Sequence, residues 1–177
     1  MRALLFIALL TTAAFAQEPA MKKQDLTAIK GSIELPEGWF LKEDTEDGVS
    51  IYQITREKTE KEGDTFTAGL ILTVTPKVQE RTGESPSAYA KDILPSSPDE
   101  PGGKELQMTE EGPLKCFRTE YDIEGEGGNI KVVNLAKAND GTSTLYFITW
   151  QSPEAEDKKL KDVREKIFSS LTVDPAY

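Results

Sequence analysis

The stretch TLYFITWQ, residues 144–151, decides the fold of this chain. Successive side chains of a strand point to opposite faces of a sheet, and the middle of this stretch, Leu145 to Trp150, is apolar on both faces. Such a strand has to be covered on both sides. The stretch therefore predicts a sheet with packing elements on each of its two faces.

A helix is expected directly after this strand. Ser152-Pro153 is typical of a helix start, with serine as the N-cap and proline at the first helical position. The following residues place apolar side chains at three- and four-residue steps, which forms one apolar stripe: Leu160, Val163, Ile167, Phe168 and Leu171. Charged side chains, Glu165 among them, are expected on the opposite face. This helix should cover one face of the sheet.

Alternation of apolar and polar residues predicts the other strands. They are expected over 29–35, 49–55, 66–74, 104–109, 115–123 and 130–138. Hairpin connections, such as the charged segment 56–64 and Asn139-Asp140-Gly141, favour a mainly antiparallel sheet. A second helix should begin at Ser85-Pro86 and end before Pro95. With the N-terminal segment, it is expected to cover the second face, which gives an α+β fold arranged as a three-layer α/β/α sandwich.

The first sixteen residues are typical of a secretory signal. Arg2 supplies a positive charge, and small residues at Ala14 and Ala16 form the pattern that signal peptidase recognises. The apolar run between them has about a dozen residues, whereas a membrane-spanning helix needs about 20. The chain is therefore expected to be exported to the periplasm or secreted, without a stable membrane anchor.

The rest of the chain is expected to form one domain. Residues 1–16 would be removed as the signal peptide, 17–24 would be a flexible leader, and 25–177 would fold as a single unit. A chain of this size can bury a core without disulfide or metal staples.

Composition excludes several classes of function. The chain has 31 acidic and 21 basic residues, a net charge of −10, and no histidine. Nucleic-acid binders need basic surface to neutralise phosphates, so that class is excluded. Without histidine, the commonest general base and metal ligand are lacking, as is every Ser-His or Cys-His pair. We therefore predict no catalytic, cofactor-binding or metal-ligating residues and no enzyme activity.

Two local features admit a chemical interpretation beside a structural one. Cys116, the only cysteine, is either a reactive thiol or a small buried hydrophobic residue; we favour the second. Asp122, Glu124, Glu126 and Asn129 surround a glycine-rich turn, where they could bind a hard cation or form a solvated hairpin tip. The sequence does not distinguish these two alternatives.

Two serines and four aromatic residues that could be taken for functional residues are assigned structural roles. Ser85 and Ser152 are interpreted as helix caps rather than nucleophiles. Four aromatic side chains at strand or turn positions are assigned to the core rather than to a ligand pocket: Trp39, Tyr146, Phe147 and Trp150.

The order of these elements resembles the PsbP-like proteins. Segment 32–39, SIELPEGW, is similar to their opening strand and Leu-Pro-x-Gly-Trp turn, and 48–51 follows at a matching distance. Segments 145–150 and 169–173 are similar to their closing strand and tail, so the resemblance covers about 29–173. It implies a single PsbP-like domain and a non-enzymatic binding or assembly role. Among these proteins, the bacterial envelope members of the DcrB type have the exported location that is expected for this chain.

These observations lead to one main hypothesis and two alternatives. The main one is an exported, non-enzymatic accessory module that contacts a protein partner or an envelope component. The alternatives are a carrier that binds a small ligand or cation, and a hydrolase that relies on carboxylates.

The exported product is predicted to begin at Gln17, because Ala14-x-Ala16 follows the apolar run. Intact-mass measurement on protein isolated from its native host checks this. A mass that still includes residues 1–16 would contradict both the cleavage and the expected location.

Overall fold

A computed structural model of the chain describes residues 19–59, 66–94, 103–125 and 127–174. The expected signal peptide lies outside the described residues, as do most of the loop after the Ser85 helix and part of the charged segment 56–64. The strands are β1 Met21–Leu26, β2 Gly31–Pro36, β3 Phe40–Glu46, β4 Val49–Thr55, β5 Gly69–Thr75, β6 Gln107–Glu111, β7 Leu114–Gly125, β8 Gly128–Asn139 and β9 Thr144–Pro153. The helices are the 3-10 turn η1 Thr27–Ile29, and α1 Val78–Thr82, α2 Pro86–Ile93 and α3 Glu154–Ser170.

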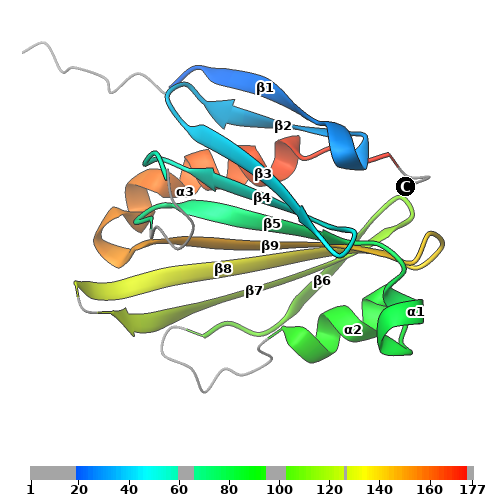
Figure 1. Cartoon of the computed structure of the whole chain (residues 1–177). Coiled ribbons are helices and arrows are strands. Elements are labelled where there is room, and N and C mark those ends of the chain that lie inside the picture. The colour runs from blue at the N-terminus through cyan, green and yellow to red at the C-terminus, as the bar shows by residue number, and fades with distance from the viewer. Residues whose placement is uncertain (1–18, 60–65, 95–102, 126, 175–177) are drawn as a thin grey trace, which may run out of the picture.

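Seven strands form one sheet in the order β3-β4-β5-β9-β8-β7-β6 (Figure 1). Every neighbouring pair in it is antiparallel, and β1 and β2 form a separate two-stranded hairpin. β9 occupies the centre, between β5 and β8. The prediction of an α+β fold with a mainly antiparallel sheet is therefore confirmed.

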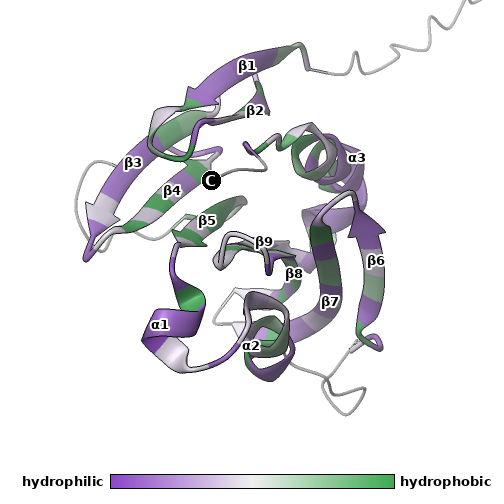
Figure 2. Cartoon of the chain, turned by 90° about the vertical axis from the view of Figure 1, so that its right-hand side faces the viewer, coloured by the Kyte–Doolittle hydropathy of each residue, from purple (hydrophilic) through white to green (hydrophobic). Residues whose placement is uncertain are grey.

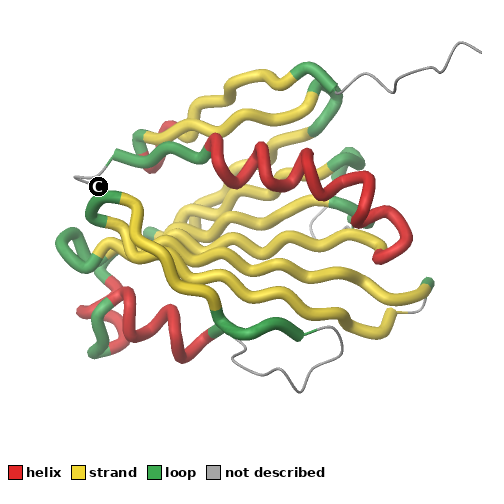
Figure 3. The backbone as a smooth tube through the Cα atoms, turned by 180° about the vertical axis from the view of Figure 1, so that it is seen from behind, coloured by secondary structure: helices red, strands yellow, loops and turns green. Residues whose placement is uncertain are grey.

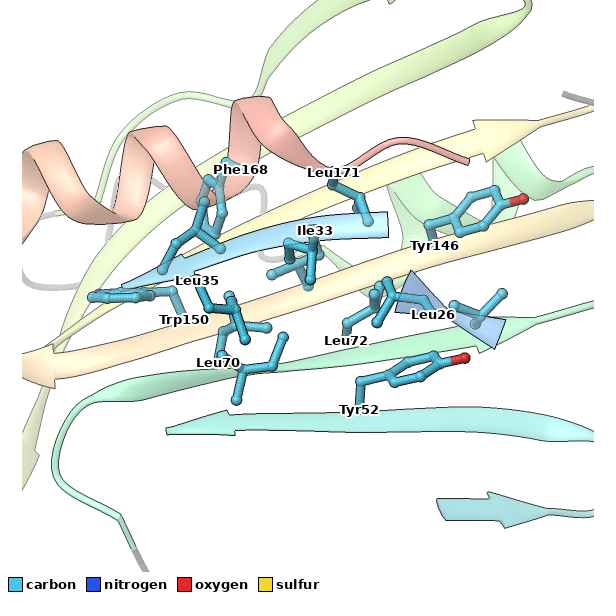
Figure 4. Close-up of a cluster of buried hydrophobic side chains, with 14 of the residues drawn as sticks. Leu26, Ile33, Leu35, Tyr52, Leu70, Leu72, Tyr146, Trp150, Phe168 and Leu171 are labelled. Carbon is cyan, nitrogen blue, oxygen red and sulfur yellow. The ribbon is translucent and has the colours of Figure 1, made fainter. Parts of the chain in front are cut away.

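One face of the sheet is covered by α3 and by the β1–β2 hairpin, as the end-on and rear views show (Figures 2 and 3). The core on this face contains Tyr146, Ile148 and Trp150 of β9 together with Ile167 and Phe168 of α3. Side chains of the hairpin join the same cluster, among them Ile33 and Leu35 (Figure 4).

The opposite face is covered by α1 and α2 near one end of the sheet (Figure 1). Here Leu145 of β9 packs with Val78, Ala90 and Phe117, and Phe147 lies against this second cluster. β9 thus buries apolar side chains on both of its faces, as its sequence predicted.

The N-terminal segment lies on the other face from the one expected. The sequence predicts this segment on the same side as the Ser85 helix, but β2 packs beside α3, and Ser32 pairs with Thr172 just after α3. The backbone N–H groups of Ser32 and Thr172 donate to one another's carbonyl oxygens at 3.0 and 2.9 Å. These two bonds join the hairpin to the C-terminal segment on one face.

The expected leader is wrong in part, because Met21 to Gln24 belong to β1 rather than to a flexible segment. Most residues of β1 are exposed and polar, so the strand carries no alternating pattern in its sequence. It exists because it pairs in register with β2. The same reason explains β3, an exposed strand that the sequence analysis did not predict.

The expected N-cap at Ser152 is also wrong. β9 continues through Pro153, which pairs with Ile130, so Ser152 remains in the strand and α3 begins at Glu154. The buried Ser152 hydroxyl accepts a hydrogen bond from Trp150 Nε1 at 3.3 Å and donates one to Asp157 Oδ1 at 3.4 Å. By contrast, Ser85 caps α2 as predicted, because its hydroxyl accepts a bond from the N–H of Ala88 at 3.3 Å.

The Pro-x-Gly-Trp turn places Trp39 over the sheet. The N–H of Trp39 donates to the carbonyl of Pro36 at 3.1 Å, and Gly38 adopts a φ of 88°, which glycine allows without steric cost. The ring of Trp39 stacks on Trp150 with centroids 5.8 Å apart. Within the described residues, no helix is long and apolar enough to cross a membrane.

Gly69→Ala is predicted to destabilise the protein by about 1–3 kcal/mol, the usual cost of overpacking. A Cβ at Gly69 would lie 2.4 Å from the carbonyl oxygen of Ile54 and 2.9 Å from the Cα of Thr55, both backbone atoms of the adjacent strand. The measurement is the urea unfolding midpoint. Gly127→Ala is the matched control, because a Cβ there meets no atom within 4 Å; equal midpoints for the two variants would refute the prediction.

Candidate binding site at the β6 edge

β6 forms one outer edge of the seven-stranded sheet (Figure 2). It pairs with β7 on one side, and among the described residues no strand pairs with its other side. The hairpin closes through the two-residue turn Gly112-Pro113, in which Gly112 has a φ of 59°. All five residues of β6 are exposed, and Met108 retains 58% of its accessible surface. An exposed strand edge of this kind is a surface that a further strand can join.

A cavity of about 280 Å³ lies between the β6 edge and α3, and is called the α3-side cavity here. Its lining on β6 comes from Gln107, Thr109 and Glu111, which share one face of the strand. Leu135 and Phe168 contribute the apolar part of the lining. The cavity therefore combines a polar strand face with a small apolar floor.

Two cations are held in the wall of the α3-side cavity. Lys137 is buried, with 6% of its side chain exposed, and its Nζ lies 2.7 Å from Oε2 of the exposed Glu111. Arg118 forms two parallel hydrogen bonds with Glu165 of α3, each 2.7 Å long, and a further one of 2.8 Å with Glu120. Bidentate pairs of this type fix geometry as well as charge, so Arg118 fixes α3 relative to β7.

The ion pairs set the charge states of the carboxylates. The hydrogen bonds from Arg118 hold the pKa of Glu165 below its ordinary value, despite the opposing effect of burial. Burial alone would raise the pKa of Glu120, but hydrogen bonds from Lys104 and Arg118 outweigh it and lower that pKa. Both side chains are therefore ionised and engaged at neutral pH, which does not suit a proton-transferring role.

Cys116 lines the same cavity but is a poor nucleophile there. Burial, followed by the nearby charge of Glu111, raises the pKa of its thiol to about 11. At neutral pH the thiol is protonated, whereas the reactive form is the thiolate. Only 3% of the residue is accessible, which agrees with the interpretation of Cys116 as a small buried hydrophobic residue.

A second cavity, of about 300 Å³, lies on the other face of the same edge, between β6–β7 and α2. This α2-side cavity is lined by Met108, Phe117 and Lys91, and by the polar Glu110 and Lys115. The Nζ of Lys91 lies 5.8 Å from the centroid of the Phe117 ring. β6 is thus flanked by one cavity on each face.

The acidic turn predicted as a possible cation site lies at the far tip of the β7–β8 hairpin. Asp122 forms an ion pair with Lys131, while Glu124 and Asn129 are exposed and face one another across the hairpin. Glu126 lies outside the described residues. Within the described parts of the chain, no three or more His, Cys, Asp or Glu side chains are grouped so as to hold a metal ion.

The aromatic candidates do not line either cavity at the β6 edge. Tyr146 and Trp150 are fully buried in the core, and Phe147 packs against the smaller cluster. No sequence pattern predicts the role of Lys137 or the Arg118–Glu165 pair, and the apolar stripe of the last helix predicts Glu165 on its solvent face. The only signal was the charged face of β7, which carries Arg118 and Glu120 at alternating positions.

Comparisons with solved structures identify the fold. PsbP from the cyanobacterium Synechocystis matches with a TM-score of 0.58 and 12% identity, covering 93% of this chain and 99% of that one. A Bacteroides thetaiotaomicron protein matches with a TM-score of 0.53 and 13% identity, covering 86% of this chain and 48% of that protein. The Ran-binding protein Mog1p of Saccharomyces cerevisiae matches with a TM-score of 0.47 and 11% identity, covering 88% of this chain and 96% of that protein. The chain therefore has the PsbP-like fold that the sequence resemblance predicted. No family model and no curated protein sequence matches it.

The Arg118–Glu165 pair predicts a specific pH dependence of stability. The pKa of Glu165 is lowered in the folded state from an unfolded value near 4.5. Its stabilisation is therefore present above that value and is lost as the pH falls through the folded pKa. Arg118→Gln should make the decrease in the urea midpoint between about pH 5 and about pH 3 less steep. Lys161→Gln, which changes an exposed cation of the same helix, is the control, and identical profiles for the Arg118 variant and the parent would rule the prediction out.

Proposed function

We propose that this chain is an exported, non-enzymatic accessory protein that binds a protein partner or an envelope component through the β6 edge. The observation that carries the proposal is an exposed strand edge with a cavity on each of its faces. We also propose a three-layer α/β/α arrangement, with β1–β2 and α3 as one outer layer and α1–α2 as the other.

A binding role is supported by how the site's reactive groups are used. Glu120 and Glu165 are engaged by cations, and Cys116 is held as a protonated thiol. The chain supplies no histidine that could act as a base. A PsbP-like fold does not by itself carry a function, since function resides in the site rather than in the fold. Export rests on the sequence of residues 1–16 alone.

Site-specific photo-crosslinking tests the contact surface. A benzoylphenylalanine placed at Met108 of β6 should crosslink to one discrete partner in the native envelope, because that side chain is exposed at the α2-side cavity. The matched control places the same group at Asp44, an exposed position on β3 at the opposite edge of the sheet. Equal crosslinking from both edges, or none from position 108, would contradict the proposal. A small molecule that co-purifies with the protein in native mass spectra, in place of a crosslinked partner, would favour the carrier.

A further inference from the structure

The open edge of β6 presents backbone groups to a further strand. A two-residue turn is closed by a hydrogen-bonded residue pair, and here that pair is Glu111 and Leu114. Bonded and non-bonded pairs alternate along an antiparallel ladder. Counting back from Glu111, the backbone N–H and C=O groups of Met108 and Glu110 therefore face away from β7. Within the described parts of the chain, no backbone group bonds to these N–H and C=O groups, so they can pair with the backbone of an incoming strand.

The two cavities match the side-chain pattern of such a strand. Successive side chains of an added strand would point alternately to the two faces of the sheet. One set would meet the α2-side cavity, where Met108 and Phe117 lie beside the charged Lys91, Glu110 and Lys115. The other set would meet the α3-side cavity, where the polar Thr109 and Glu111 line the strand face. The geometry thus favours an extended incoming segment whose side chains enter the two cavities alternately.

Charge at the edge indicates which strand can bind. Glu105, Glu110 and Glu111 are all exposed, and β6 itself contains no lysine or arginine. Four cations beside the edge are already paired with carboxylates: Lys104 with Glu120, Lys115 with Asp140, Lys137 with Glu111, and Arg118 with Glu120 and Glu165. Among the described residues, Glu105 and Glu110 form no ion pair, so their charges remain available to an incoming strand. A second copy of this chain would bring the same carboxylates together, and like charges placed opposite one another destabilise a strand pair. A basic segment would instead be attracted. The other sheet edge, β3, includes Lys42, the residue type that most often blocks edge pairing.

We infer that the β6 edge binds a basic, extended segment of another protein by strand addition, with alternate side chains entering the α2-side and α3-side cavities. This inference rests on the proposed function and specifies its binding mode. Backbone hydrogen bonds would provide affinity, and the two cavities would provide specificity.

The test uses the peptide acetyl-Lys-Val-Lys-Val-Lys-Val-Lys-amide and the ¹⁵N-labelled exported protein. Binding should shift the amide resonances of β6 and slow hydrogen exchange at Met108 and Glu110. Two N-methylated peptides provide the decisive comparison, one methylated on the valines and one on the lysines. In a paired strand, the backbone N–H groups of either the valines or the lysines face β6 and donate to it. Only the peptide methylated on those residues should therefore lose affinity, by roughly tenfold.

Matched controls separate strand addition from charge attraction. A peptide with glutamate in place of lysine should not bind. Glu105→Gln with Glu110→Gln should weaken binding several-fold, whereas Glu43→Gln with Asp44→Asn on β3 should leave it unchanged. Equal affinity of the two N-methylated peptides, or slowed exchange at β3 in place of β6, would overturn the inference. Partner crosslinks at position 108 without these signatures would leave the contact surface standing and eliminate strand addition alone.

Discussion

Double burial of β9 is the constraint on which the rest of the structure depends. Tyr146, Ile148 and Trp150 have no exposed surface on one face, while Leu145 is buried on the other. A strand of this composition is stable only inside a sheet with cover on both sides, since a large apolar side chain stabilises by about 1.5–3 kcal/mol when it is fully buried. Trp150 is the centre of the larger cluster: Trp39 stacks on it, Phe168 meets it edge-on, and Arg164 lies 6.0 Å from its ring.

The main contacts of the helices on both faces of the sheet end before β6, and the candidate site follows from that. α3 packs beside β2 and lies over β8 and β9, while α2 lies over β7, β8 and β9. β6 lies beyond the main contacts of both helices among the described residues, so its residues remain exposed. The cavities form where each helix stops short of the sheet edge. The helices that bury the central strand β9 therefore leave the edge strand β6 exposed, with a cavity on each of its faces.

Ion pairs at that margin stabilise the arrangement of the elements more than they stabilise the fold as a whole. A buried pair gains little net free energy, because desolvation offsets most of the attraction, but breaking it leaves an unpaired charge. Arg118 connects β7 to Glu165 of α3, and Lys137 connects β8 to Glu111 at the edge. The Arg118–Glu165 pair fixes the position of α3 on the sheet, and the Lys137–Glu111 pair holds Glu111 at the α3-side cavity. The shape of the α3-side cavity therefore depends on charges that the surrounding core does not require.

The sequence by itself determined the elements whose burial is periodic. The two apolar faces of 144–151, the stripe on α3 and the alternation in β5 each report how many sides of an element are buried, and the Pro-x-Gly-Trp turn follows from the φ that glycine permits. Only the tertiary structure decided the rest. β1 and β3 are polar strands that exist through pairing, so they leave no periodic signal, and Ser152 stays in β9 because Pro153 still pairs with β8. Periodicity indicates that a face is buried but not which neighbour buries it. For that reason the hairpin's position beside α3, the partners of Arg118 and Lys137, and the open edge of β6 could be read only from the folded chain.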